Sequence, residues 1–332
     1  MARRPRLGKK LVKSLLPLLL LIGIALGGVF GWIVYDISRP QRRPYLVTPA
    51  AFVQISGPGV KATEETWRNK DGTNARGWLL RGAEGAPAVV LLHRYGADRS
   101  WLFNLGVKLN ETTNFTILWP DLRGHGMDPP VKWSSLGMRE GDDVLAAIAY
   151  LKQLKTPKDE FLVGNSFGVY GVELGAYAGL KAAAQDGRVR VLVLDSVPAD
   201  ANQMVNSAAR AETGLENSFI QSLTHLAMRV YFMGRYDNAD SCTLAQYLRA
   251  PNVLLLSGPD AGYWRNSTAK LATCFPNRGN VELKNDLPLT GSNLPSATGE
   301  QGEAYDRRVI EYFDQHLRTQ PTTLTNAAPP PQ

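Results

Sequence analysis

The chain has 332 residues, 44% of them apolar, and a formal net charge of +7. This length is enough for one large domain or two small ones. Six of its 37 basic residues precede the first acid, Asp36, and the remaining 31 are nearly balanced by 30 acidic residues. A nucleic-acid surface needs basic residues clustered on the folded part, so this distribution argues against nucleic acid as a partner.

The N-terminus combines a basic segment, residues 1–14, with an uncharged apolar run at 15–35. The run is long enough to cross a bilayer as a helix. Six basic residues precede it and three follow closely, which favours a cytoplasmic N-terminus and a folded domain on the outer (periplasmic or extracellular) side. A cleaved signal peptide is the alternative, but it would have a shorter apolar core and a small-x-small cleavage site. The sequence predicts a single-pass transmembrane anchor.

Composition divides the rest of the chain into three parts. Residues 36–58 carry four prolines and predict an extended linker, and residues 59–318 form the folded domain. The tail, 319–332, ends in Ala-Ala-Pro-Pro-Pro-Gln and is too poor in apolar residues to build a core, so we expect it to be disordered.

Strand and helix patterns alternate through the domain. Predicted strands are 61–68, 75–81, 88–92, 115–119, 160–163, 189–194, 252–256 and 280–284; predicted helices are 101–110, 139–154, 169–184, 268–274 and 305–317. The stretch 198–249 is mostly helical and predicts a cap inserted between two strands. This alternation is typical of a mostly parallel α/β sheet, here eight-stranded, with helices on both faces. Sites in such sheets lie beyond the carboxyl ends of the strands.

The strongest local motif is Gly164-Asn165-Ser166-Phe167-Gly168, between a predicted strand and a predicted helix. A sharp strand-to-helix turn exposes its central residue, and glycines two positions to either side relieve the crowding. The turn also aims backbone N–H groups and a helix N-terminus at a developing oxyanion. This context predicts Ser166 as a nucleophile.

Three further segments follow in a recognisable order. Residues 88–101 contain His93-Arg94-Tyr95-Gly96, residues 121–128 read Asp-Leu-Arg-Gly-His-Gly-Met-Asp, and a final helical segment covers 305–313. Together with the motif at Ser166, residues 60–318 resemble the α/β-hydrolase superfamily. The resemblance implies an α/β-hydrolase fold and chemistry without a metal or organic cofactor.

The resemblance also implies roles for individual residues. Ser166 would be the nucleophile and Asp260, after the seventh strand, the acid, with Asp195 as the weaker alternative for the acid. Backbone N–H groups of Phe167 and Tyr95 would form the oxyanion hole. The chain departs from the family at Arg94, where glycine is usual, which makes Tyr95 the less secure donor.

The histidine of the family's triad has no counterpart at its expected place. The loop 285–302 contains no histidine, and Ser292 or Asn293 stands at that distance from the last helix. His93 and His125 are interpreted as structural hydrogen bonders. His225 falls in the predicted cap and His316 in the last helix. Without a base, a serine hydroxyl is a poor nucleophile.

Two hypotheses follow. The first is a membrane-anchored serine hydrolase acting on an ester or other small acyl substrate. The second is a catalytically inactive member of the same fold that serves as a binding or scaffold protein at the membrane. Cys242 and Cys274, the only cysteines, are compatible with a disulfide or with two buried thiols.

Overall fold

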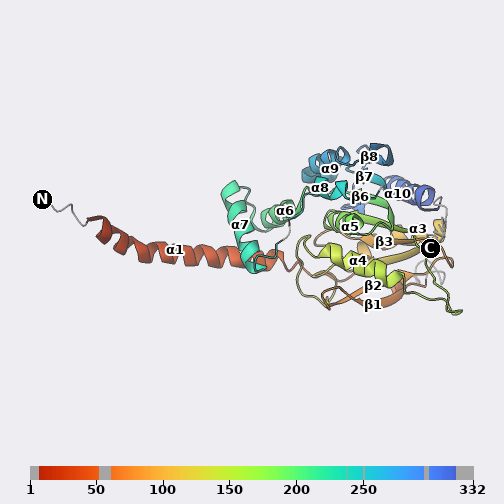
Figure 1. Cartoon of the computed structure of the whole chain (residues 1–332), viewed down its shortest axis with the longest axis horizontal. Coiled ribbons are helices and arrows are strands. Elements are labelled where there is room, and N and C mark those ends of the chain that lie inside the picture. The colour runs from red at the N-terminus through yellow and green to blue at the C-terminus, as the bar shows by residue number, and fades with distance from the viewer. Residues whose placement is uncertain (1–6, 52–60, 237, 250, 295–298, 319–332) are drawn as a thin grey trace, which may run out of the picture.

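The computed structural model describes residues 7–51, 61–236, 238–249, 251–294 and 299–318. A long N-terminal helix, α1 (Leu7–Ile37), leads into a domain built on one twisted sheet (Figure 1). The strands are β1 (Thr63–Arg68), β2 (Asn74–Leu80), β3 (Ala88–Leu92), β4 (Thr116–Pro120), β5 (Phe167–Val172), β6 (Val189–Asp195), β7 (Asn252–Leu256) and β8 (Val281–Lys284). The predicted tail, residues 319–332, lies outside the described residues.

The eight strands lie in the order β1-β2-β4-β3-β5-β6-β7-β8. Strand β2 pairs antiparallel with β1 and β4, and every pair from β4 to β8 is parallel. The predicted fold class is confirmed. The central strands β3, β4 and β5 are buried along their whole length, as expected for strands covered on both faces.

Helices cover both faces of this sheet. One face packs against α3 (Phe103–Thr113) and α10 (Glu300–Arg318), and the other against α4 (Glu140–Leu151), α5 (Leu174–Gln185) and α9 (Arg265–Ala272). Short 3₁₀ turns lie at Arg99–Leu102, Pro259–Trp264 and Arg278–Asn280. Each face therefore has its own apolar cluster, and the carboxyl ends of the parallel strands stay available for a site.

One predicted strand is in the wrong place. Residues 160–163 form no strand, and Lys155 and Phe161 make only an isolated antiparallel bridge. The fifth strand is β5, and α5 begins at Leu174 rather than at 169. The Phe313 ring of α10 occupies the space where a Cβ on Gly168 would lie, at 2.7 Å. Glycine at this position therefore belongs to a strand packed under a helix, and not to a turn.

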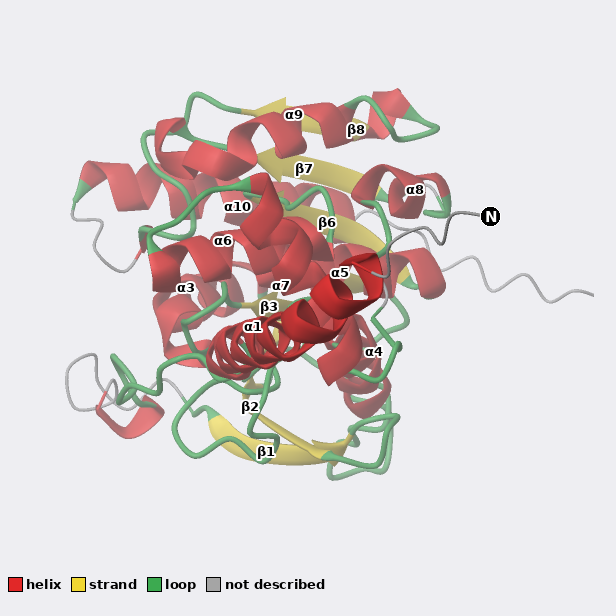
Figure 2. Cartoon of the chain, turned by 90° about the vertical axis from the view of Figure 1, so that its left-hand side faces the viewer, coloured by secondary structure: helices red, strands yellow, loops and turns green. Residues whose placement is uncertain are grey.

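Helix α1 continues from its apolar stretch directly into the domain. Residues Leu15–Ile37 are long and apolar enough to cross a membrane, with a mean hydropathy of 2.3. Phe30, Ile33, Val34 and Ile37 nevertheless join the core of the domain. Tyr95 Oη donates a hydrogen bond to the Ile37 carbonyl at 2.7 Å, which fixes the end of the helix. Viewed along its length, α1 crosses in front of the sheet (Figure 2).

The stretch predicted as a cap is helical. It contains α6 (Ala201–Thr213), α7 (Ser218–Tyr231) and α8 (Ser241–Gln246), and both α6 and α7 contact α1. Figure 1 shows α6 and α7 between α1 and the sheet. Cys242 of α8 and Cys274, just after α9, form a disulfide with Cα atoms 5.1 Å apart. The bridge ties the end of the cap to the helix that follows β7.

Candidate active site

The chain turns sharply from β5 into α5 at Glu173. This residue has φ 49° and ψ −108°, a conformation that L-residues rarely adopt. Such a backbone costs on the order of 1–3 kcal/mol and persists only where its surroundings hold it in place. Glu173 thus has the strained, projecting position that a nucleophile occupies in a strand–elbow–helix unit.

The glycines two residues to either side make this turn possible. A Cβ added to Gly171 would lie 2.4 Å from the carbonyl group of Gly175. One added to Gly175 would lie 2.4 Å from the Leu92 carbonyl oxygen on the neighbouring strand. The elbow is therefore Gly171-Val172-Glu173-Leu174-Gly175, with glutamate at its centre.

The Glu173 side chain meets a serine. Ser292 Oγ donates a hydrogen bond to Glu173 Oε1 at 2.5 Å. Burial raises the pKa of the Glu173 carboxyl group above its usual range, and the Ser292 hydrogen bond and the charge of Arg94 partly offset that rise. The Glu173 N–H donates to the Asp195 carbonyl at 2.9 Å, which ties the elbow to the end of β6.

Two more carboxylates lie at the same edge of the sheet. Asp195 ends β6, and its Oδ2 accepts from the Gly291 N–H at 2.7 Å and from Tyr305 Oη at 2.6 Å. Asp260 follows β7, and its Oδ2 accepts from Asn293 Nδ2 at 2.6 Å. Burial raises the pKa of Asp195 to about 7. Both carboxylates hold the loop that carries Ser292.

Ser166 lies away from this group. It immediately precedes β5, and its carbonyl accepts from the Ala88 N–H at the start of β3. At about 3.3 Å per residue, the six residues of β5 separate Ser166 from the elbow by roughly 20 Å. The predicted elbow at residues 164–168 is therefore wrong. Ser166 lies at the amino ends of the strands, opposite the edge where sites form.

A family model described as alpha/beta hydrolase family matches residues 89–318, which is more than two thirds of the chain. The chain belongs to the alpha/beta hydrolase family. No curated protein sequence matches it.

Solved structures agree on the fold. An esterase from Pyrococcus furiosus is 17% identical with a TM-score of 0.62, and the match covers 85% of this chain and 99% of the esterase. A carboxyl esterase from Tuber melanosporum is 11% identical with a TM-score of 0.57, over 86% and 93% of the two chains. The alpha/beta hydrolase GrgF from Penicillium is 16% identical with a TM-score of 0.54, over 78% and 99%. At these identities the likeness concerns the fold.

The histidines of this alpha/beta hydrolase do not meet the elbow. His93 donates from Nδ1 to the Arg94 carbonyl and accepts at Nε2 from the Leu122 N–H. His125 likewise bonds the Arg123 carbonyl and the Gly96 N–H. Burial lowers their pKa values to about 4 and about 3. The predicted structural role of both residues is confirmed, because each neutral ring uses both nitrogens on backbone groups.

The other two histidines lie on helices remote from the elbow in sequence. His225 of α7 bonds Asn206 Oδ1 at 2.8 Å, and the ring of His316 on α10 packs against Tyr312. Ser292 hydrogen-bonds the elbow residue, and the adjacent Asn293 bonds the carboxylate of Asp260. The place expected for the triad histidine is thus filled by a serine and an asparagine.

The predicted oxyanion donors also need revision. The Phe167 N–H donates to the Arg188 carbonyl at 3.0 Å, so it is committed within the sheet, and Phe167 as a donor is wrong. The corresponding N–H after Glu173 is that of Leu174. Tyr95 stays a prediction for the second donor, and its side chain is engaged with α1. Arg94, the departure from the family's glycine, brings a guanidinium whose Nη1 donates to the Tyr95 carbonyl at 3.0 Å.

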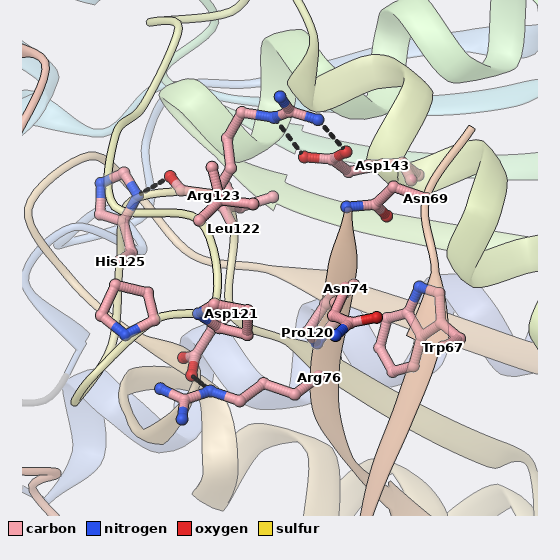
Figure 3. A pocket seen from close by; sticks show the side chains of 15 residues that line it. Trp67, Asn69, Asn74, Arg76, Pro120, Asp121, Leu122, Arg123, His125 and Asp143 are labelled. Carbon is pink, nitrogen blue, oxygen red and sulfur yellow. Dashed lines mark hydrogen bonds and ion pairs between the residues drawn. The ribbon is translucent and has the colours of Figure 1, made fainter. Parts of the chain in front are cut away.

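A buried polar network braces the neighbouring loop, residues 121–128 (Figure 3). Arg123 Nε donates to Asp143 Oδ2 at 2.7 Å, and Arg76 Nε donates to Asp121 Oδ2 at 3.2 Å. Asp121 also accepts from Tyr45 Oη at 2.7 Å, which fastens the segment after α1 to the domain. A small cavity of about 20 Å³ lies among these side chains, enough for little more than one water molecule.

The motif used to predict the nucleophile requires serine between two glycines, so it did not identify Glu173 and its flanking glycines. The signal was present: Gly171-Val172-Glu173-Leu174-Gly175 follows a run of aromatic and β-branched residues typical of a buried strand. The spacing of the glycines identifies the elbow, whatever residue lies at its centre.

Proposed function

We propose that this alpha/beta hydrolase is a membrane-anchored binding or scaffold protein that does not hydrolyse substrates by a serine–histidine mechanism. The observation that carries this proposal is Glu173 at the centre of the elbow, hydrogen-bonded to Ser292. The position of the family's serine nucleophile therefore holds glutamate, and the position of its triad histidine holds serine.

The substitution at the elbow removes more than a nucleophile. A serine hydrolase stabilises negative charge that develops beside the N-terminus of the elbow helix. Here the Glu173 carboxyl group already lies at that terminus. An ionised carboxylate would repel an oxyanion, and a protonated one is a poor nucleophile. Loss of the base alone costs about 10⁴–10⁶ in rate in such triads.

The membrane part of the proposal rests on α1. Its apolar stretch is of spanning length, and the excess of basic residues before it favours a cytoplasmic N-terminus. The Cys242–Cys274 disulfide supports an oxidising, outer-side location for the domain. The domain would then present its site at the outer surface of the membrane.

The Ser292–Glu173 pair itself favours a second candidate function. With the two positions exchanged, Ser292 would be the nucleophile and Glu173 its base, at 2.5 Å. A carboxyl group with a raised pKa is closer to what a general base needs near neutral pH. This second candidate is an acyl hydrolase that acts on a small ester without histidine.

A rate measurement separates the two candidates. The full-length chain in detergent is assayed against short-chain and medium-chain esters from pH 4 to 8, beside Ser292→Ala and Ser166→Ala. If the chain is a binding protein, the wild type, Ser292→Ala and Ser166→Ala should all show the same background rate of ester hydrolysis. The serine–carboxylate hydrolase predicts a rate that rises with pH as Glu173 ionises and disappears in Ser292→Ala alone. A rate lost in Ser166→Ala alone would contradict both.

A further inference from the structure

We propose that helix α7 is embedded in the outer leaflet of the membrane beside α1, so that the domain binds lipid through two elements rather than one. This inference rests on the proposed anchoring of α1. It concerns a surface that the family's fold and site leave unexplained.

The position of α7 along the anchor carries the inference. A groove between the two helices is lined by Gly23, Gly27 and Gly31 of α1, and by Leu223, Leu226 and Val230 of α7. At a rise of 1.5 Å per residue, Gly23 and Gly31 lie about 15 and 27 Å beyond Lys13, the last charge before the apolar stretch. Because the hydrocarbon layer is about 30 Å thick, this part of α1 belongs to its outer half.

The surface chemistry of α7 agrees with that depth. Phe219, Leu226 and Val230 are 65%, 57% and 70% exposed, and Met233 just beyond the helix is 87% exposed. The spacing of seven and four residues places Phe219, Leu226 and Val230 on one side of the helix. Met228 and Thr224, on the other side, are buried against the domain. A helix with one face in the protein and an apolar face outward is typical of interfacial membrane helices.

The connection between anchor and domain fixes this arrangement. Ile33, Val34 and Ile37 are buried in the same apolar cluster as Met228 of α7. The Ser134 N–H donates to the Ser38 carbonyl at 2.7 Å, just after α1 ends. Because α7 is packed against α1, residues 23–31 of α1 cannot lie in the bilayer unless α7 lies at the same depth. Helix α1 therefore sets the depth of α7.

The groove between α1 and α7 is large enough to hold a lipid acyl chain. It has a volume of about 430 Å³, and a Cβ added to Gly23, Gly27 or Gly31 would meet no atom within 4 Å. The glycine side of α1 is thus not packed against α7, and the walls of the groove are mostly apolar. The occupant that fits is the acyl chain of a membrane phospholipid.

Depth-dependent quenching tests the proposal on the full-length chain in phosphatidylcholine vesicles. Both native cysteines are in the disulfide, so a single added cysteine carries the fluorescent label. Val230→Cys reports on α7, Leu19→Cys on the anchor, and Lys158→Cys on an exposed turn of the domain. Quenching is measured with lipids that carry a spin label in the middle of the acyl chain.

We expect quenching at Val230→Cys within about twofold of Leu19→Cys and at least about fivefold above Lys158→Cys, since an interfacial helix reaches the acyl chains. Strong quenching at Leu19→Cys with none at Val230→Cys would overturn the embedding of α7 and leave the anchor intact. Absence of quenching at Leu19→Cys would refute the anchoring and this inference with it. Close approach between labels on two copies, detected by energy transfer at Val230→Cys, would assign the groove to a second chain and overturn the lipid assignment.

Discussion

The loop at residues 121–128 and the elbow at Glu173 lie at the same edge of the sheet, yet they differ in what they have kept. The loop retains the family's Asp-x-Arg-Gly-His-Gly pattern, and its Asp121, Arg123 and His125 side chains all make buried contacts. The elbow retains the backbone, with its glycines and positive φ, but has Glu173 at its centre.

The loop at residues 121–128 supports the fold, whereas the central residue of the elbow determines the chemistry. A buried polar network is costly to leave half satisfied, so a change at one member of the loop disturbs the others. The central side chain of the elbow projects from the turn and contacts the loop that follows β8. Glutamate is accommodated there because Ser292 donates a hydrogen bond to it, and the fold survives without a serine–histidine pair.

The largest effect should come from the loop. Arg123→Ala would leave the Asp143 carboxylate buried and unpaired, because these side chains are only 1% and 9% exposed. We expect the free energy of unfolding to fall by about 3–5 kcal/mol, measured by denaturant titration. Lys132→Ala breaks an exposed pair with Asp128 and serves as the control. A loss in the control as large as in Arg123→Ala would refute the distinction between buried and surface pairs.

A smaller effect is expected at the elbow backbone. Gly171→Ala forces a Cβ against the Gly175 carbonyl, so we expect a loss of about 1–3 kcal/mol in the free energy of unfolding. Gly279→Ala is the matched control, because a Cβ there meets only an asparagine oxygen at 3.3 Å. Equal stability of the two variants would contradict the tight elbow.

Next in size is a dependence on pH at Asp195. Burial raises the pKa of this carboxyl group to about 7 in the folded protein, so the native state holds the proton more tightly than the unfolded state. Its contribution to stability is present at low pH and is lost as pH rises from about 4 to about 7. We expect Asp195→Asn, which cannot ionise, to gain at least about 1 kcal/mol on the wild type between pH 5 and pH 8. Parallel pH profiles would show that Asp195 has an ordinary pKa.

An effect on rate, with the least expected effect on stability, tests whether the elbow geometry alone is sufficient. Glu173→Ser restores a hydroxyl but no base, so we expect no ester hydrolysis above background. Adding Ser292→His supplies an imidazole at the position that now contacts the elbow residue. We expect the double variant to hydrolyse short esters about 10²-fold faster than Glu173→Ser, the lower end of what a general base contributes. An active Glu173→Ser single variant would reveal a base elsewhere.

The sequence predicts most of the fold, because strong local patterns decide it. The strands at 88–92 and 252–256 have the predicted bounds, since uninterrupted apolar runs suit a buried parallel sheet. The fifth strand is misplaced because Gly168 and Gly171 resemble turn residues. Only the tertiary contacts of Phe313 and Gly175 show why glycine is needed at both positions inside that strand.

The site is less predictable than the fold for a related reason. The spacing of glycines at 164 and 168 matched the expected motif around a serine, while the true elbow carries the same spacing around a glutamate. The sequence has no histidine near residue 292, and in the structure Ser292 and Asn293 contact Glu173 and Asp260. That Ser292 meets Glu173 depends on two loops that are 119 residues apart, which no local pattern encodes.

The central claim is that no serine among the residues that the structure describes is activated by a histidine. Its most direct test is exposure of the full-length protein to a fluorophosphonate probe, followed by intact-mass measurement at pH 5 and pH 8. The account predicts no adduct on Ser166 of the folded wild type under conditions that label a serine esterase to completion, whereas an adduct on Ser292 would favour the serine–carboxylate hydrolase. One probe group per chain at Ser166, lost in Ser166→Ala, would contradict it.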